Sequence, residues 1–416
     1  MAVLQITSLL IVLAGIFGAI NYLFLKLPSS IGILIVALIT SFGLLGVDYM
    51  SPGLGIADSV RGMVASVDFS ETLLEGMLGL LLFAGALHVK TSELRREWLA
   101  VLLMATLGVA LSTFVVGFSF SWLTGIPTAL VFGALISPTD PVAVLGVLRE
   151  ADLPKSLETK IAGESLFNDG VGYVVFLILV GLAFSQSGEN GHEATTFLDM
   201  LLLFVQEAGG GALLGLVLGW LTFRVMRRID DYALEVLLTL GLAFGGYELA
   251  VALKVSAPIM AVCAGLLIGD VGAAKGMSEE TRKYVDAFWQ LIDEILNAVL
   301  FLMIGFEVFA VAFDGDMLLT GIASIMLALA GRLVAVAVPI SILRPFRNFD
   351  SGVIRIMTWG GLKGGISVAL ALSLPDSEWK PLILTSTYIV VVFSIIIQGL
   401  TIAKLANRVG RNPDLI

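Results

Sequence analysis

Apolar stretches long enough to cross a membrane follow one another along almost the whole chain of 416 residues, with short polar connections between them. Most stretches have the roughly 17 to 25 residues that an α-helix needs to cross the hydrocarbon core of a bilayer. Backbone polar groups in hydrocarbon must be satisfied within the segment, which favours helices. Hydrophobic residues make up 58% of the sequence and charged residues only 14%, which excludes an ordinary soluble domain. The sequence therefore predicts an all-α polytopic membrane protein.

The apolar stretches predict thirteen transmembrane helices. The first stretch lacks the basic segment and small-residue cleavage site of a signal peptide, so we expect it to be retained. The less apolar segment 51–68 is expected to lie along the membrane interface. The predicted spans are residues 3–25, 29–47, 71–90, 97–123, 126–148, 157–184, 198–226, 232–253, 256–270, 286–311, 316–343, 352–374 and 380–406.

Lysine and arginine are distributed asymmetrically over the connections between these spans. If the N-terminus is outside, 19 of the 24 basic residues fall in inner loops or the C-terminal tail and three in outer loops, while Arg332 and Lys363 lie inside spans. Cytoplasmic loops of membrane proteins are enriched in Lys and Arg. The pattern therefore predicts an outside N-terminus, a cytoplasmic C-terminus and a multi-pass protein of the inner cell membrane.

Two of the predicted spans contain helix breakers. The fifth contains Pro138 and Pro141, and the twelfth contains four glycines within residues 360–365. Irregular backbone at membrane depth occurs where it is buried in protein or lines a cavity. Spans five and twelve are seven apart, so they run in opposite directions. This arrangement predicts two inverted six-helix repeats joined by one linker helix, with the crossing breaks at a transport site.

Polar residues cluster at the first break and in the following span. Thr139 and Asp140 lie at the break, where freed carbonyl groups and a carboxylate offer hard oxygen ligands for a small cation. A helix cap at the kink is the structural alternative. Ser165 and Asp169 are four residues apart on one helix face and are expected to join Asp140 around the ion. Asn168 is expected on the neighbouring strip of that helix.

The remaining charged residues inside spans have structural explanations. Glu164 shares the strip of Asn168, and Arg332, which cannot lose its charge, needs an acidic partner; we expect a buried Glu164–Arg332 ion pair. Lys363 in the glycine break has two plausible roles, which are to compensate the negative end of a half-helix or to pair with a carboxylate.

A buried carboxylate beside another one favours its protonated form, because burial and like-charge repulsion both disfavour the ion. A cation and a proton would then compete for the same oxygens of Asp140 and Asp169. Competition of this kind couples the movement of the cation to the opposite movement of the proton. The two aspartates are expected to titrate as a coupled pair.

At these residues the chain resembles the monovalent cation:proton antiporters of the bacterial NhaP type, which are related to animal and plant sodium/proton exchangers. The similarity covers nearly the whole chain. The motifs that carry it are SPTDPVAVLGVL (137–148), GESLFNDGVGYVVF (163–176), FWQLIDEILNAVLFLMIGFEV (288–308), GRLVAVAV (331–338) and WGGLKGGISVALAL (359–372). The pairing of TDP with ND is specific, whereas either motif alone is weak.

The resemblance implies functional roles for several of these residues. It implies a cation site made by Thr139, Asp140, Ser165 and Asp169, with the two aspartates carrying the cation or proton. An asparagine at position 168 implies electroneutral one-for-one exchange. The resemblance also implies that Glu164 pairs with Arg332 and that Lys363 stands where relatives have arginine.

The resemblance further implies a homodimer with a moving core. The expected divisions are a scaffold and dimer domain over 1–95 and 230–312, a core domain over 96–185 and 316–408, and a linker helix over 198–228. The chain departs from many relatives at Ala84, where they carry an acidic residue in the third span. This departure leaves the preference for sodium over potassium open.

We therefore expect an electroneutral sodium or lithium/proton antiporter working by alternating access with an elevator-like core movement. The alternatives are a potassium/proton antiporter or, less readily, a cation channel or sensor of the same fold. No nucleophile with a base, metal motif or nucleotide loop indicates an enzyme, and Cys263 alone cannot form an internal disulfide. The expected partners are membrane lipid, the transported ions and a second copy of the chain, with no cofactor and no nucleic acid.

Overall fold

The structure is a computed structural model that describes residues 3–51, 55, 60, 62, 69–140, 144, 155–184, 197–272, 276–311, 314–347, 349 and 352–411. Within these ranges the regular elements are helices and no strand occurs. The helices of the first half are α1 (Val3–Ile20), η1 (Asn21–Leu25), α2 (Ser29–Met50), α4 (Phe69–Glu71), η3 (Thr72–Met77), α5 (Leu78–Leu87), α6 (Thr91–Leu103), η4 (Met104–Gly108), α7 (Val109–Thr124), α8 (Leu130–Ile136) and α10 (Lys155–Phe184). Those of the second half are α11 (Phe197–Met226), α12 (Tyr232–Ala252), α13 (Ala257–Leu267), η6 (Ile268–Gly272), α15 (Glu279–Phe306), η7 (Glu307–Ala310), α16 (Gly315–Leu343), α17 (Val353–Trp359), α18 (Gly365–Leu372), α19 (Lys380–Phe393), η8 (Ser394–Gln398) and α20 (Gly399–Arg411).

The helices have the lengths and composition of a membrane protein. Among the residues that the structure describes, nine helical segments are long and apolar enough to cross a bilayer, and the apolar segment Ala257–Asp270 is shorter. The predicted all-helical membrane architecture is confirmed. The count of thirteen spans stays a prediction. Most of segment 51–68 and the second half of the predicted fifth span lie outside the described residues.

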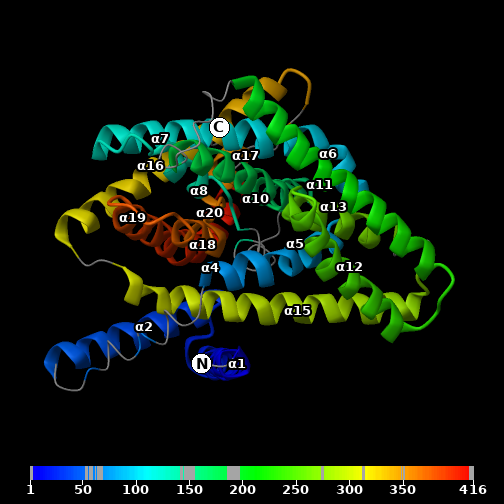
Figure 1. Ribbon diagram of the computed structural model, residues 1–416, viewed down its shortest axis with the longest axis horizontal. Helices are drawn as coiled ribbons and strands as arrows, with labels where there is room; N and C mark the ends of the chain where they lie inside the picture. Colours follow the sequence, from blue (N-terminus) through cyan, green and yellow to red (C-terminus); the bar gives the residue numbers. More distant parts are fainter. Residues whose placement is uncertain are drawn as a thin grey trace.

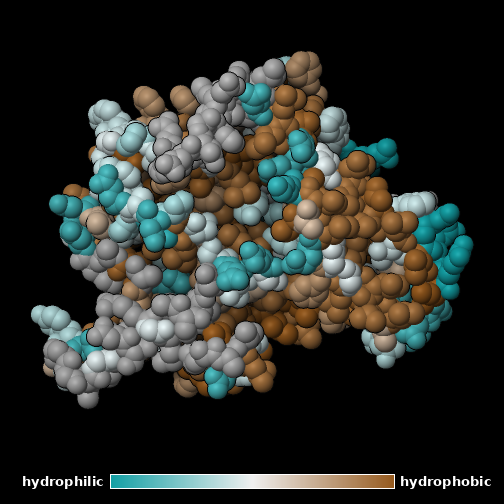
Figure 2. All heavy atoms as spheres, viewed as in Figure 1, coloured by the Kyte–Doolittle hydropathy of each residue, from teal (hydrophilic) through white to brown (hydrophobic). Residues whose placement is uncertain are grey.

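Large apolar side chains cover much of the outer surface. Figure 2 shows hydrophobic side chains over a broad area of one face. Only 11% of the most apolar window of α11 is buried inside the protein, and its exposed side chains include Leu201, Leu202, Leu213 and Leu216. A soluble monomer rarely exposes a continuous apolar surface of this extent. Lipid is the environment that this surface fits.

The helices form two groups by their contacts. In Figure 1 the long helix α15 runs across the lower part of the molecule, with α1 and α2 below it and the other labelled helices above it. α15 packs against α1, α2, α5 and α12, and α13 packs against α5, α11 and α12. The other group is built around α16, which packs against α7 and α19, while α8 packs against α7, α10 and α18. α10 and α15 contact elements of both groups, so these two helices join the groups.

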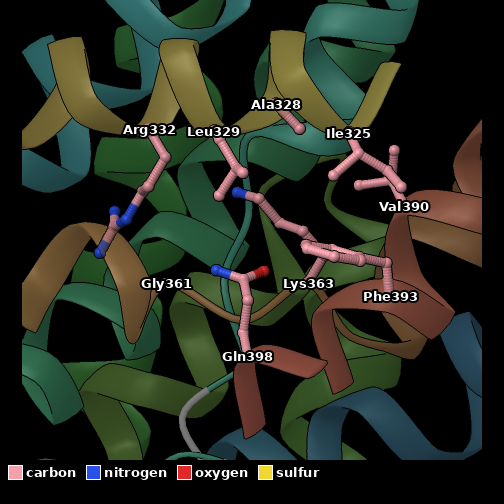
Figure 3. Close-up of a pocket in the computed structure, with 9 residues that line it drawn as sticks. All are labelled: Ile325, Ala328, Leu329, Arg332, Gly361, Lys363, Val390, Phe393 and Gln398. Carbon is pink, nitrogen blue, oxygen red and sulfur yellow. The ribbon is translucent and has the colours of Figure 1, made fainter. Parts of the chain in front are cut away.

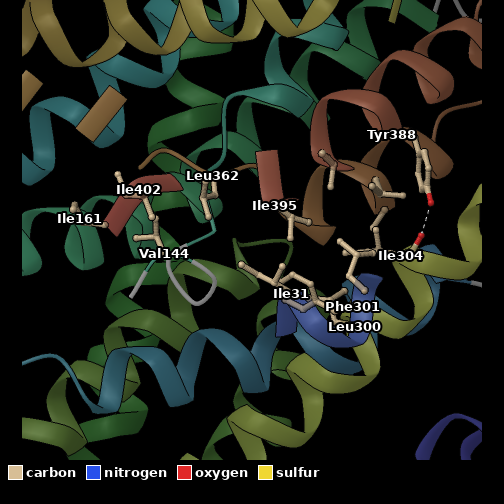
Figure 4. Packing of buried hydrophobic residues seen from close by; sticks show 14 of the residues in the cluster. Ile31, Val144, Ile161, Leu300, Phe301, Ile304, Leu362, Tyr388, Ile395 and Ile402 are labelled. Carbon is tan, nitrogen blue, oxygen red and sulfur yellow. Dashed lines mark hydrogen bonds between the residues drawn. The ribbon is translucent and has the colours of Figure 1, made fainter. Parts of the chain in front are cut away.

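A hydrophobic cluster between the two groups of helices fixes the position of the second helix break. Leu362 is fully buried, and Figure 4 shows it near Val144, Ile395 and Ile402. The same cluster includes Leu300 and Ile304 of α15, and the Tyr388 hydroxyl donates to the Ile304 carbonyl at 2.9 Å (Figure 4). The apolar packing therefore holds the irregular backbone of residues 360–364 in one place.

Candidate functional site at the crossing of two interrupted helices

Two irregular segments meet inside the helix bundle. α8 ends at Ile136 and residues 137–140 are not helical; α17 ends at Trp359 and α18 begins only at Gly365. The Asp140 backbone N–H donates to the Leu362 carbonyl at 2.8 Å, which joins the two segments directly. A Cβ atom on Gly364 would lie 2.6 Å from the Asp140 Cβ. Glycine is required there because the two backbones approach so closely.

Lys363 stabilises the broken end of α8. Its ammonium group donates to the carbonyl oxygens of Ser137 at 3.1 Å and Pro138 at 3.2 Å, and its side chain is 3% exposed. These carbonyls follow the last turn of α8, where the helix dipole is negative. The contact is the helix-end contact that the sequence analysis gave as one of two roles. The backbone N–H of Lys363 donates to the Ser394 hydroxyl at 2.8 Å.

Hydroxyl and amide groups of α10 hold the first irregular segment. The hydroxyls of Thr139 and Ser165 form a hydrogen bond of 2.9 Å. The Asn168 amide nitrogen donates to the Thr139 hydroxyl at 2.8 Å, and its amide oxygen accepts from the Thr139 backbone N–H at 3.2 Å. Asn168 lies one turn from Glu164 on α10, as helix periodicity predicts, and its amide contacts Thr139. Asn168 therefore fixes the position of the break.

Asp169 is the buried carboxylate at this crossing with an oxygen left unpaired. The residue is 4% exposed, and its Oδ1 atom has no hydrogen-bond partner within the described part of the chain. It interacts electrostatically with Asp140 and Lys363, so these three charged groups belong to one site. Asp140 itself is half-buried. A buried carboxylate oxygen without a donor is an acceptor available to a cation or a proton.

The predicted ion pair between Glu164 and Arg332 is formed beside this site. Both guanidinium NH groups contact the Glu164 carboxylate, and the Nη2–Oε2 distance is 2.8 Å. Arg332 also donates from Nε to the Met357 carbonyl at 3.2 Å, and both residues of the pair are buried. A Cβ on Gly361 would lie 2.1 Å from Nε of Arg332. The pair thus joins α10, α16 and α17 next to the second break.

A small cavity adjoins the second break on the side of α16. Its polar lining comes from Arg332, Lys363 and Gln398, and its apolar lining from α16 and α19 (Figure 3). Gln398 donates from Nε2 to the Trp359 carbonyl at 2.9 Å and so satisfies the end of α17. Sequence reasoning missed both Gln398 and Ser394. The sequence signal was weak, because the same span carries other polar residues such as Thr385 and Ser386. The structure places Ser394 and Gln398 in a π-helical turn, a feature common at functional sites.

The ligand set at the crossing consists of hard oxygen atoms. Thr139 and Ser165 supply hydroxyls, and Asp140 and Asp169 supply carboxylates. Over the described ranges, no group of three or more His, Cys, Asp or Glu residues could hold a metal ion as a resident centre. Ala84, where relatives were expected to carry an acid, is fully buried among apolar side chains of α5 and α13. Hydroxyl and carboxylate oxygens of this kind are ligands for hard cations.

Comparison with known proteins identifies the family. The family model described as "Sodium/hydrogen exchanger, transmembrane" matches residues 8–408. The chain belongs to this family. It is a family of membrane transporters and not of enzymes. The resemblance found in the sequence is therefore confirmed.

Related proteins span the full length of the chain. The Na(+)/H(+) antiporter NhaP of Pseudomonas aeruginosa is 46% identical over 99% of this chain and 98% of its own length. The Na(+)/H(+) antiporter NhaH of Halobacillus dabanensis is 35% identical, with 93% of each chain covered. The solved structure of the sodium proton antiporter MjNhaP1 from Methanocaldococcus jannaschii matches with a TM-score of 0.74 over 98% of this chain and 99% of that chain, at 21% identity. This last likeness shows the shared fold.

Proposed function

We propose that this chain exchanges sodium ions for protons across the cell membrane, with both ions using one site at the crossing of the two breaks. The observation that carries the proposal is the buried, unpaired Oδ1 of Asp169 beside the hydroxyl pair of Thr139 and Ser165. Names of relatives support the same reading, because NhaP of Pseudomonas aeruginosa and NhaH of Halobacillus dabanensis are both named Na(+)/H(+) antiporters.

Competition between the two ions follows from the carboxylates. A sodium ion needs the oxygens of Asp140 and Asp169 in their ionised form, whereas a proton converts one of them into a neutral acid. The two ions therefore exclude each other. An occupied site crosses with sodium in one direction and with a proton in the other.

The formal charges of the site predict electroneutral exchange. Asp140 and Asp169 carry two negative charges when ionised, Lys363 carries one positive charge, and Glu164 and Arg332 cancel each other. One negative charge remains, and either one sodium ion or one proton neutralises it. An empty site would carry net charge through hydrocarbon, which costs at least about 2.5–3.5 kcal/mol at the bilayer centre. The loaded site thus crosses more easily than the empty one, and voltage does not act on it.

Alternating access would come from movement of the core against the scaffold. The core comprises residues 96–185 and 316–408, the scaffold and dimer domain comprises 1–95 and 230–312, and residues 198–228 form the linker. The packing of α8 against α10 and α18, and of α16 against α17, supports assigning both breaks to the core. In this proposal the chain forms a homodimer in the inner membrane, with thirteen spans in two inverted repeats, an outside N-terminus and a cytoplasmic C-terminus.

Transport by purified protein in liposomes tests this proposal. With a preset pH gradient and a pH-sensitive dye inside, addition of sodium or lithium should collapse the gradient, at a rate unchanged by an imposed potassium–valinomycin voltage. Asp169→Asn should abolish the collapse, and Asp376→Asn, at an exposed loop position, should not. If potassium collapses the pH gradient faster than sodium does, the transported cation is potassium and not sodium. Cation flux without proton counterflow would indicate a channel and refute antiport.

A further inference from the structure

The long helix α15 presents a carboxylate to the crossing from outside the core. Asp293 is half-buried, seven residues before Leu300 on the same face of the helix. Leu300 touches the second break, since a Cβ on Gly365 would lie 2.4 Å from its Cδ1. Two helical turns correspond to about 10 Å, so Asp293 stands roughly that far along α15 from the break.

The Asp293 side chain is held in place rather than free to swing away. The buried Asn297 amide donates to the Asp293 carboxylate at 3.0 Å and to its backbone carbonyl at 2.7 Å. One turn earlier, the fully buried Trp289 packs against Phe83 of α5 with ring centroids 4.7 Å apart. This part of α15 is therefore fixed against α5, and the carboxylate has a defined position.

The charged groups around Asp293 show which way it faces. It interacts electrostatically with His88 at the end of α5, with Asp140 at the crossing and with its neighbour Glu294. Glu294 is exposed and accepts a hydrogen bond from Gln290 at 3.3 Å. Two adjacent acidic residues of one helix thus differ in surroundings: Asp293 is half-buried and held by Asn297, and Glu294 is exposed.

We propose that Asp293 is a second determinant of cation affinity, acting on the site at Asp140 from the scaffold side of the interface. The negative charge of Asp293 stabilises a cation at the crossing by electrostatic attraction, although the side chain does not contact the ion. This inference rests on the proposed sodium/proton exchange. Because α15 lies in the proposed scaffold, the distance between Asp293 and Asp140 changes when the core moves. Asp293 therefore raises the cation affinity in the conformation that this structure describes.

The expected effect is a change in affinity and not in turnover. The rise of two turns along α15 sets a scale of about 10 Å between the Asp293 charge and the crossing. A unit charge at that distance, acting through an effective dielectric of about 20 to 40, changes the binding constant of a monovalent cation by about four- to fifteenfold. At a pH high enough that protons no longer compete for the site, Asp293→Asn should therefore raise the apparent KM for sodium by about this factor, with Vmax changed less than about twofold. The asparagine oxygen can still accept the bond from Asn297, so a purely structural role predicts no change in KM.

Initial rates of sodium-driven proton movement in liposomes test this inference with two further variants. Glu294→Gln removes the same charge one residue away and should leave KM within about twofold of the wild-type value. Asp293→Glu keeps the charge and should restore most of the affinity. An unchanged KM in Asp293→Asn, or an equal rise in Glu294→Gln, would overturn the assignment.

A binding measurement keeps the test decisive if Asp293→Asn does not transport. Sodium bound to the folded protein raises its melting temperature in detergent, and the concentration for the half-maximal rise follows the dissociation constant. That concentration should increase about four- to fifteenfold in Asp293→Asn; an unchanged value would refute the proposal. If the wild-type protein neither exchanges nor is stabilised by sodium, the proposed function itself fails, which is a different result.

Discussion

Removal of one partner of the Glu164–Arg332 pair should destabilise the protein far more than removal of both. Both residues are buried, and the guanidinium group contacts both carboxylate oxygens and the Met357 carbonyl. Glu164→Gln keeps the size of the side chain but leaves the arginine charge without its counter-ion. Breaking a buried pair in this way costs about 3–5 kcal/mol. Replacing both residues, in Glu164→Gln/Arg332→Met, removes the orphaned charge and should recover most of that loss.

The size of the effect is measurable by thermal unfolding in detergent. An average unfolding entropy of about 2.1 cal/mol/K per residue converts 3–5 kcal/mol into a drop in Tm of about 3–6 °C for a chain of this length. Tryptophan fluorescence is a suitable signal, because Trp289 is fully buried. The exposed pair of Asp376 and Lys380 supplies the control, and Asp376→Asn should leave Tm unchanged within error.

Two results would refute the reasoning on this ion pair. The first is a Glu164→Gln variant with the Tm of the wild-type protein, since the arginine would then need no acidic partner. The second is a double variant as unstable as the single one, since the loss would then come from packing and not from charge. Because the pair is assigned a structural role, the double variant should still exchange ions at a temperature where it is folded.

Three further predictions concern the crossing itself. Gly364→Ala puts a Cβ 2.6 Å from the Asp140 Cβ. This overpacking should lower the free energy of unfolding by about 1–3 kcal/mol and abolish exchange in liposomes. Exchange at the wild-type rate would contradict the close approach of the two segments. Asn168→Asp adds a negative charge beside Thr139, so any remaining exchange should become sensitive to membrane voltage. Exchange that stays independent of voltage would show that the formal charge of the site does not determine electroneutrality. Lower pH should raise the apparent KM for sodium, by up to about tenfold per unit where protons outcompete the ion, since protons occupy the same carboxylates. A KM independent of pH at constant Vmax would show that the two ions bind at separate sites.

The membrane fold and the positions of both helix breaks could be predicted from the sequence, because each rests on a local cause. Apolar length predicts helices in lipid, and Pro138 or the glycines of residues 360–365 interrupt them wherever they occur. The ion pair of Glu164 and Arg332 was predictable for a similar reason, since a buried arginine needs an acid and few acids lie inside spans.

The contacts that depend on how the two breaks cross could not be predicted in this way. Helix periodicity places Asn168 one turn from both Glu164 and Ser165. Which of these neighbours shares a hydrogen-bond partner with Asn168 depends on the position of Thr139, which contacts both Ser165 and Asn168. The sequence left two roles for Lys363, and its distance to the end of α8 supports one. Asp293 is an acidic residue inside the predicted span 286–311, where the sequence favours the lining of a water-filled funnel or a span end over ion binding. The packing of α15 against the break is what connects it with the site.

Exchange at a single site requires that one sodium ion displaces one proton from the carboxylates at the crossing. The most direct test adds sodium chloride to purified protein in weakly buffered detergent solution and follows the pH, with choline chloride as the salt control. The wild-type protein should release about one proton per chain, and Asp169→Asn should release none. Sodium binding without proton release, or equal release from the Asp169→Asn variant, would contradict exchange at a single site.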